Sequence, residues 1–330
     1  MTSTTPLPAM KAAICRRYGP PDVVEIADVP RPSFGANDVL VKVCATTVTA
    51  ADWRLRSFNL PRGFGVLVRL GVGISGPRQP ILGSELAGEV VAAGQAVSRF
   101  APGDKVFAAR MGDCHAEYAA VREDAVAPMP ANLSFGEAAA LTFGGLTALI
   151  FLRDKARIQP GERVLVNGAS GAVGSAAVQL AKHFKAIVTG VCSAANAELV
   201  RSLGADRVID YGTEDFTRTG DRYDIIFDAV GNCAFDQCKP VLAPGGRLLL
   251  VVGSLGQMIG AMVWSSRGGR KVLSGVASVR TADLLFLRTL AEAGAFKPVI
   301  DRTYPFARIV DAHAYVDTGH KRGNVVIALD

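Results

Sequence analysis

Apolar positions in the middle and later parts of the chain occur in short runs that recur about twenty residues apart. The runs show almost no polar alternation, as expected for strands buried on both faces, and they lie at 164–166, 187–191, 208–209, 225–227 and 248–252. After the first run, apolar residues from Val173 to Phe184 follow a helical period. This alternation of strand and helix predicts an α/β domain with a doubly wound parallel sheet over residues 131–277.

The first 130 residues have a different pattern, in which short β-branched segments are separated by Gly and Pro and no long helical period appears. The clearest of these expected strands lie at 39–43, 88–94 and 104–108. The pattern predicts a mainly-β domain in this part of the chain.

Sequence signals also mark the boundary between the mainly-β segment and the α/β segment. Ser134 and Glu137 have the spacing of a capping box, so we expect a helix from there to about Lys155. After the α/β domain we expect a helix over 283–293 and a last strand over 325–329 that returns to the first domain's sheet. The predicted organisation is therefore a mainly-β domain formed by 1–130 and 278–330, with the domain of 131–277 inserted into it.

A glycine-rich loop joins the first predicted strand of the α/β domain to its first helix, and it reads Gly168-Ala169-Ser170-Gly171-Ala172-Val173-Gly174. Its glycines permit a tight turn and let backbone N–H groups approach a pyrophosphate, while the helix N-terminus adds positive potential. A purely structural glycine turn is the alternative. Because a strand precedes the loop, a helix follows it and further strands come after, the loop predicts a dinucleotide site.

The end of the second predicted strand favours NADPH over NADH. A site for NADH carries Asp or Glu there to bind the ribose 2′-hydroxyl, whereas residues 190–196 contain no acid. Ser193 and Asn196 can instead donate hydrogen bonds to a 2′-phosphate, although either could simply cap the helix that starts near Ala197.

Several further motifs occur in a fixed order, and their sequences span 10–13, 83–90, 103–106, 115–118, 145–148, 203–211, 228–231 and 323–326. With the glycine loop, they make the chain similar to the medium-chain dehydrogenase/reductases, in the zinc-independent quinone oxidoreductase (zeta-crystallin-like) branch. The resemblance covers residues 10–330. It implies a GroES-like catalytic domain completed by the C-terminal tail, an inserted Rossmann domain, a cofactor in the cleft between them and a homodimer formed through the Rossmann sheet edge.

The resemblance also implies roles for individual residues. It places Thr147 near the nicotinamide, Tyr211 at the 2′-phosphate, and along the ribose and nicotinamide Val230, Gly231, Val252, Gly253 and Ser254. Two departures from the family pattern weaken the 2′-phosphate site: Ala194-Ala195 stand where relatives often have a basic residue, and Asn324 stands where Lys is common. We therefore expect Asn324 at the cofactor site and a loosely held 2′-phosphate.

The zinc-ligand positions of the family contain no zinc ligands here. Relatives that bind zinc have Cys and His where this chain has Thr49 and Ser84, and a hydroxyl is a poor ligand for zinc. No two cysteines are separated by two residues, and the four histidines show no ligand spacing. We therefore expect no metal.

Without a metal, the expected reaction is hydride delivery from NADPH to an electron-poor acceptor, either a quinone or the C=C bond of an α,β-unsaturated carbonyl. By analogy, Thr49 would donate a hydrogen bond to the developing enolate oxygen, with Asp52 and Arg54 as further catalytic residues that shape the pocket. The alternative is that Asp52 and Arg54 only pair with each other and Thr49 is a turn residue. A rival function is a catalytically retired NADPH-binding structural or regulatory protein.

Composition and charge exclude other partners. The chain is 49% hydrophobic and 20% charged, which excludes a disordered protein, and its few dispersed cysteines with no secretory signal predict a cytoplasmic location. The long uncharged stretches are interrupted by Gly, so no membrane partner is expected. The net charge of +6 does not predict nucleic-acid binding, because no basic face with aromatic platforms is found.

Much of the positive charge lies in one segment. No acidic residue occurs between Asp52 and Glu85, and the cations there are Arg54, Arg56, Arg62, Arg69 and Arg78. We expect residues 60–80 to form a mobile apolar and basic flap over the cleft that attracts an anionic ligand. The alternative is an ordinary surface loop.

Overall fold

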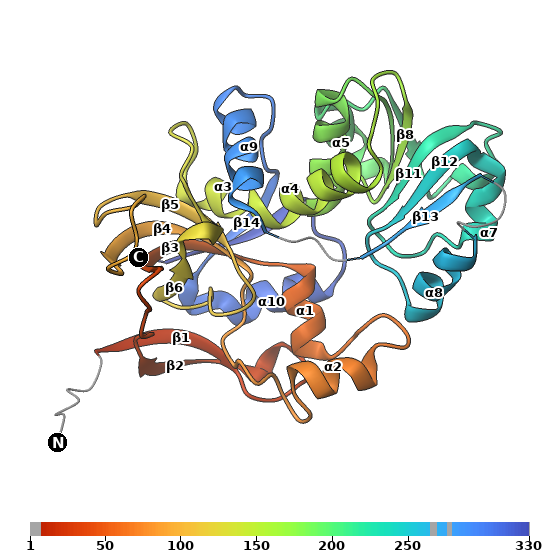
Figure 1. Cartoon of the computed structure of the whole chain (residues 1–330). Helices are drawn as coiled ribbons and strands as arrows, with labels where there is room; N and C mark the ends of the chain where they lie inside the picture. The colour runs from red at the N-terminus through yellow and green to blue at the C-terminus, as the bar shows by residue number, and fades with distance from the viewer. Residues whose placement is uncertain (1–7, 265–268, 276–278, 330) are drawn as a thin grey trace.

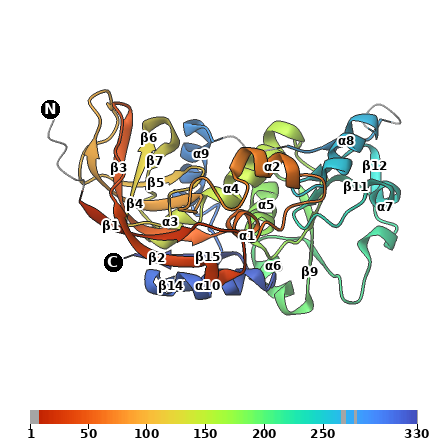
Figure 2. The same cartoon turned by 90° about the horizontal axis from the view of Figure 1, so that it is seen from below.

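The chain folds around two large β-sheets that lie side by side (Figure 1). The computed structural model describes residues 8–264, 269–275 and 279–329, so the expected domain boundary at 277 and both chain ends fall outside the described residues. Figure 2 shows the lobe of early strands on one side and the parallel sheet on the other, with helices between them.

The inserted domain has a six-stranded sheet in which all neighbouring strands run parallel, in the order β10-β9-β8-β11-β12-β13. Its strands are β8 (Arg163–Asn167), β9 (Ile187–Cys192), β10 (Arg207–Asp210), β11 (Tyr223–Asp228), β12 (Leu242–Leu250) and β13 (Lys271–Leu273). The five apolar runs identified in the sequence are the first five of these strands, so the doubly wound sheet is confirmed. The sixth strand was missed because its three residues are too short to form a recognisable apolar run.

Helices lie on the faces of this sheet, between its strands in the sequence. They are α5 (Ala172–His183), α6 (Ala197–Ser202), α7 (Phe235–Cys238) and α8 (Leu255–Trp264). The strand order reverses between β8 and β11, so the carboxyl ends of these two strands form the crevice in which open α/β sheets bind ligands.

The other large sheet is mainly antiparallel and runs β14-β15-β3-β4-β5-β7, with β6 paired to β3. Its strands are β3 (Asp38–Val48), β4 (Glu85–Ala93), β5 (Lys105–Ala109), β6 (Tyr118–Arg122), β7 (Val126–Pro128), β14 (Ile300–Pro305) and β15 (Asn324–Ala328). A separate hairpin pairs β1 (Ala9–Cys15) with β2 (Val24–Pro30). Because β15 pairs with β3, the expected return of the last strand to the first sheet is confirmed.

The apolar helix expected from Ser134 to Lys155 forms in three pieces. α3 (Phe135–Ala139) begins at the expected capping box, α4 (Thr142–Leu149) follows, and a π-helical turn covers Ile150–Lys155. The whole run is long and apolar enough to cross a membrane, but 72% of its most apolar window is buried inside the protein. That burial is the behaviour of a core helix, and α4 packs between α5 and α9 (Thr281–Glu292).

Three helices of the first lobe and tail position the candidate site. They are α1 (Ala50–Ser57), α2 (Gly65–Val72) and α10 (Ile309–Asp317). No long helix was expected in the first 130 residues, and the two α-helices that contribute to the site from this part of the chain, α1 and α2, have only eight residues each. The four-residue sequence Thr49-Ala-Ala-Asp52 is a capping box and was the available signal for α1.

Candidate active site

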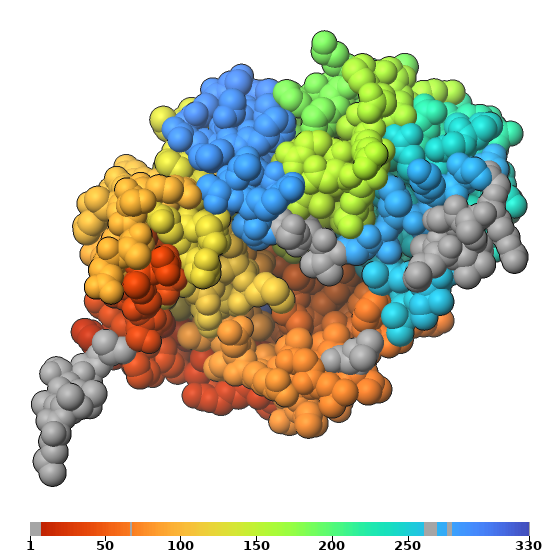
Figure 3. All heavy atoms as spheres, viewed as in Figure 1, coloured from red at the N-terminus to blue at the C-terminus, as the bar shows by residue number. Residues whose placement is uncertain are grey.

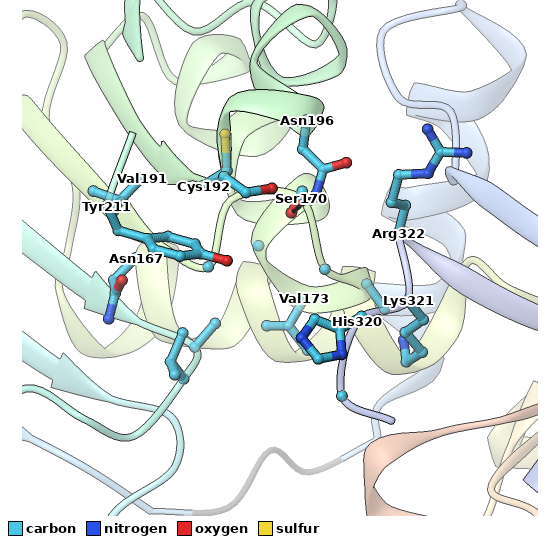
Figure 4. A pocket seen from close by; sticks show the side chains of 18 of the residues that line it. Asn167, Ser170, Val173, Val191, Cys192, Asn196, Tyr211, His320, Lys321 and Arg322 are labelled. Atoms are coloured by element: carbon cyan, nitrogen blue, oxygen red, sulfur yellow. Dashed lines mark hydrogen bonds between the residues drawn. The ribbon is translucent and has the colours of Figure 1, made fainter. Parts of the chain in front are cut away.

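A cavity of about 880 Å³ lies at the carboxyl ends of β8, β9 and β11, where the strand order reverses. Figure 4 shows its lining side chains, which come from the glycine loop, the ends of these strands and the C-terminal tail. The predicted residues that line it are Gly168, Ser170, Gly171, Ala172, Val173, Gly174, Ser193, Asn196, Tyr211 and Val230. Ten of the residues predicted from the sequence therefore line this cavity.

The glycine loop has the shape of a phosphate cradle. Gly168 has a φ of +79°, and a Cβ on Gly174 would lie 2.0 Å from the Gly168 carbonyl oxygen, so neither position accommodates a side chain without a backbone shift. Gly171 is the N-cap of α5, and no side chain caps this helix end. The free N–H groups of α5 therefore provide positive potential at the cavity wall. A Cβ on Gly171 would meet nothing closer than 3.6 Å, so the space there is open to a ligand.

The second strand ends in polar side chains that face the cavity. Neither Ser193 nor Asn196 forms a side-chain cap on the helical turns that follow, so the alternative in which they only cap a helix is not what the structure shows. The Asn196 amide donates to Ser170 Oγ at 3.1 Å. Tyr211 is 64% exposed at the cavity edge, which leaves its hydroxyl accessible to a ligand.

A buried carboxylate holds the loop that follows β11. Asp228 Oδ1 accepts from the backbone N–H groups of Val230 and Gly231, at 3.1 and 3.0 Å, and from the Asn167 amide at 2.9 Å. Its other oxygen accepts from the Cys233 N–H. The predicted residues Val230 and Gly231 are therefore fixed at the cavity wall by Asp228 and Asn167, which the sequence reasoning did not single out.

The C-terminal tail forms the opposite wall, and this contribution was missed. His320, Lys321 and Arg322 line the cavity, and Gly323 N–H donates to the Ser170 carbonyl at 2.8 Å, which ties the tail to the glycine loop. Burial lowers the pKa of Lys321 to about 8, against the opposing effect of Glu85 and Asp301. The three consecutive basic residues were the sequence signal for this wall.

Three predicted cofactor residues do not face the cavity. Asn324 is 4% exposed, and its amide donates to the Val299 carbonyl, so its side chain is used within the tail. Thr147 lies on α4 and Ala169 is fully buried within the loop, and neither lines this cavity or the smaller one beside it. The expectation that Asn324 contacts the cofactor stays a prediction, which this hydrogen bond does not support.

A second cavity of about 400 Å³ adjoins the first. Trp53 lines both, while Arg54 and the segment 59–62 form one side of the second cavity. The opposite side is formed by predicted residues of the inserted domain, namely Gly231, Val252, Gly253 and Ser254, together with Gln257. The pair of cavities provides a long groove for a dinucleotide that leads to a smaller chamber.

Thr49 and Asp52 lie beside these cavities, but their side chains are hydrogen-bonded to each other. Thr49 is the N-cap of α1, and its hydroxyl donates to Asp52 Oδ2 at 2.6 Å and accepts from the Asp52 N–H at 3.2 Å. Asp52 Oδ1 accepts from the Gly83 N–H. Both side chains are buried, and neither lines either of these two cavities. The geometry does not fit Thr49 as donor to an enolate, because its hydroxyl proton is already directed at a carboxylate.

Arg54 behaves as expected for a pocket residue. It lines the second cavity, its guanidinium lies 5.7 Å from the Trp53 ring, and burial lowers its pKa. Within the described residues it forms no ion pair with Asp52, so that alternative is not observed.

Behind the cavity, a buried carboxylate connects the two lobes. Glu85, at the start of β4, accepts from the hydroxyls of Thr47 and Thr142 and from the Phe143 N–H. Thr142 and Phe143 form the first turn of α4, so a carboxylate of the first sheet caps a helix that packs on the glycine loop. Burial raises the pKa of Glu85 to about 7, and the negative charge of Asp52 contributes to the rise.

The residues at the family's zinc positions do not fit zinc. Thr49 caps α1, and Ser84 Oγ is buried without a hydrogen-bond partner. Among the residues that the structure describes, no three His, Cys, Asp or Glu side chains gather in a way that could hold a metal ion.

The expected flap contains α2 and borders the second cavity. Arg62 lines this cavity, and its carbonyl accepts from the Leu255 N–H at 3.0 Å, which connects the segment to α8. The segment is therefore part of the cavity rim and is not an unconnected surface loop. Its mobility stays a prediction.

Comparison with known proteins agrees with this architecture. Residues 35–202 match the alcohol dehydrogenase GroES-like domain, and residues 203–327 match the zinc-binding dehydrogenase family. The chain is 32% identical to the chloroplastic NADPH-dependent alkenal/one oxidoreductase of Arabidopsis thaliana, over 96% of this chain and 79% of that protein. It is 33% identical to the chloroplast envelope quinone oxidoreductase homolog of the same plant, over 92% of this chain and 93% of that one.

Among solved structures, the quinone oxidoreductase of Coxiella burnetii superposes with a TM-score of 0.87 at 28% identity, covering 98% of this chain and all of that one. The fold is a GroES-like domain combined with a Rossmann-like domain. The chain belongs to the medium-chain dehydrogenase/reductase family, and its relatives include quinone oxidoreductases.

One expectation from composition was wrong. Most of the curated relatives compared carry chloroplastic or mitochondrial names, which contradicts the cytoplasmic location expected from the cysteine content. The physical reason is that few, unpaired cysteines indicate a reducing environment, and such an environment is not specific to the cytosol.

Proposed function

We propose that this chain is an NADPH-dependent reductase that transfers hydride, without metal, to a quinone or to the C=C bond of an α,β-unsaturated carbonyl. The observation that carries the proposal is the dinucleotide-sized cavity on the glycine loop, which adjoins a smaller chamber across Trp53. Relatives whose names specify NADPH-dependent alkenal/one reduction and quinone reduction support this choice of acceptor and cofactor.

The residues present fit such a cofactor. The glycine loop and the N-terminus of α5 would hold the diphosphate from one side, with Lys321 and Arg322 on the other. Ser193, Asn196 and Tyr211 would surround the 2′-phosphate. The bound nicotinamide supplies the hydride. The chain's own contribution is to orient both partners and to exclude water from the groove.

The second cavity would receive the acceptor. Trp53 provides a flat apolar wall, and Arg54 and Gln257 provide hydrogen-bond donors for a carbonyl oxygen on which negative charge develops. Val252, Gly253 and Ser254 would contact the nicotinamide end of the cofactor. We propose Arg54 as the catalytic donor. Thr49 and Asp52 would act as positioning residues, because they fix the first turn of α1 that carries Trp53 and Arg54.

NADPH oxidation measured against a panel of quinones and enones, with and without a chelator, tests this proposal. NADH in place of NADPH tests the cofactor preference. We expect turnover with at least one acceptor, a lower KM for NADPH than for NADH and no effect of chelator. NADPH binding without turnover on any acceptor would instead favour a retired, cofactor-binding protein. Dependence on added zinc would refute the metal-free mechanism.

A homodimer through the edge of the Rossmann sheet stays a prediction. The terminal strands of that sheet are β10 and β13, and β13 has only three residues. We propose β13 as the pairing edge, and sedimentation equilibrium of the purified protein would test dimer formation.

A further inference from the structure

Exposed apolar side chains lie on α2 and on the turn that follows it, beyond the segment 59–62 that lines the second cavity. Val66 and Leu70 are 74% and 63% exposed, and Ile74 is 68% exposed. Val66 and Leu70 are separated by one helical turn, so they lie on the same face of α2. An eight-residue helix with this much exposed branched apolar surface is unusual in a protein that meets only water.

Positive charge surrounds these apolar residues and is not balanced by neighbouring acids. Arg69 and Arg78 are exposed, and no acidic residue occurs in residues 53–84. The Arg69 guanidinium lies 4.7 Å from the Phe58 ring, and that of Arg78 donates to the carbonyls of Leu70 and Gly71. Neither arginine has a carboxylate partner in the described part of the chain, in contrast to the buried Arg56, which pairs with Asp317.

The opposite side of the second cavity also combines exposed apolar surface with a lack of acidic residues. α8 contains no charged residue, and Ile259 on it is 57% exposed. Residues 237–282 contain no acid, and Lys271 beyond α8 is exposed. Figure 3 shows the orange surface of the segment that contains α2 next to the cyan surface of α8, and the Leu255 N–H at the start of α8 donates to the carbonyl of Arg62, three residues before α2.

We propose that this rim, formed by α2, Ile74 and the part of α8 around Ile259, docks peripherally on the surface of an anionic lipid bilayer. The expectation of no membrane partner rested on the lack of an uninterrupted spanning stretch, and peripheral docking requires none. Branched apolar side chains with interspersed arginines have the composition of segments that lie in the headgroup region, where arginine is attracted to anionic lipid. The arginines without carboxylate partners complement anionic headgroups, and the exposed Val, Leu and Ile side chains suit the boundary with the acyl chains.

The rim lies next to the second cavity, so docking would bring this cavity to the membrane surface. The wall of the second cavity is continuous with both helices. Segment 59–62 precedes α2, Ser254 precedes α8, and Gln257 lies in the first turn of α8. A lipophilic acceptor dissolved in the bilayer would enter this cavity without crossing water. This consequence rests on the proposed reductase function, whereas the docking itself does not.

Cosedimentation with vesicles tests the docking without cofactor or turnover. We expect binding to phosphatidylcholine vesicles that contain about 30% phosphatidylserine, weak binding to phosphatidylcholine alone and a loss of binding at high salt. The double variant L70Q/I74Q should lose binding, and R69Q should weaken it about fivefold. Leu285→Gln on α9 and the 86%-exposed Arg218→Gln are matched controls away from the rim and should bind as wild type.

Two results would overturn the proposal. One is equal binding of wild type and L70Q/I74Q to the anionic vesicles. The other is a change in the oligomeric state of L70Q/I74Q in lipid-free solution, because the rim would then cover a second copy of this chain. Failure of the proposed function is distinguishable, since NADPH oxidation with a water-soluble quinone is measured separately and should be unchanged in L70Q/I74Q.

Discussion

The buried carboxylate of Glu85 provides a quantitative prediction. Burial raises its pKa to about 7 in the folded protein, against an ordinary value of 4.5. Each pKa unit corresponds to about 1.4 kcal/mol, so keeping this carboxylate ionised in the fold costs about 3 kcal/mol. The variant Glu85→Gln removes the charge and retains the shape.

The sign of the pH dependence follows from the raised pKa. Below pH 4.5, Glu85 is protonated in both the folded and the unfolded chain, and its contribution to stability is fully present. Between pH 4.5 and 7 the unfolded chain loses a proton that the folded chain keeps, so the stability of the wild type falls. Above pH 7 the loss is complete. Lys321 changes charge near pH 8, above the steepest part of this window.

Urea denaturation at several pH values between 4.5 and 8 measures the effect. We expect the free energy of unfolding of Glu85→Gln, relative to wild type, to increase by about 3 kcal/mol from the lowest to the highest pH. A constant loss accompanies it, because a glutamine offers one acceptor oxygen where the carboxylate accepts from Thr47, Thr142 and the Phe143 N–H. The exposed Glu89→Gln on the same strand is the control. Parallel curves for wild type and Glu85→Gln would refute the reasoning.

Three further predictions concern the cavities. Gly174→Ala should abolish NADPH binding and destabilise the loop, because its Cβ would lie 2.0 Å from the Gly168 carbonyl oxygen. Gly171→Ala should fold normally and lose only affinity for NADPH, as measured by fluorescence titration. Thr49→Val should lower the free energy of unfolding by about 1–2 kcal/mol through the lost cap, with Thr49→Ser nearly unaffected; unchanged stability would contradict the capping role. Arg322→Gln should weaken NADPH binding about tenfold in the same titration, and unchanged affinity would remove the tail from the cofactor site.

Features that depend on local sequence were predictable. The parallel strands were predicted from their apolar runs. The glycine loop was predicted because residues within seven positions of one another determine its conformation. The capping box at Ser134 was found for the same reason. An equivalent box at Thr49 was overlooked, and with it the structural use of both the Thr49 hydroxyl and Asp52. A residue that matches a catalytic position by alignment can be occupied by such a local hydrogen bond, which only coordinates reveal.

Features that depend on long-range pairing were not predictable in the same way. The tail reaches the glycine loop because β15 pairs with β3, and this register places Gly323 against Gly171. No local pattern states which of the basic residues before β15 will face the cavity. Glu85 is a similar case, since its partners Thr142 and Phe143 lie far along the chain and meet it only when the two lobes pack.

The tail also changes the argument about the cofactor's charge. The sequence predicted weak retention of the 2′-phosphate, because Ala194-Ala195 and Asn324 replace basic residues common in relatives. The structure places Lys321 and Arg322 on the cavity wall opposite the glycine loop, where they add positive charge on the diphosphate side, with Arg322 3.8 Å from the Asp301 carboxylate. An anion bound there would stabilise the charged form of Lys321, whose pKa is held near 8 by burial. Cofactor affinity should therefore depend on the tail more than on Asn324, whose amide is bonded to Val299.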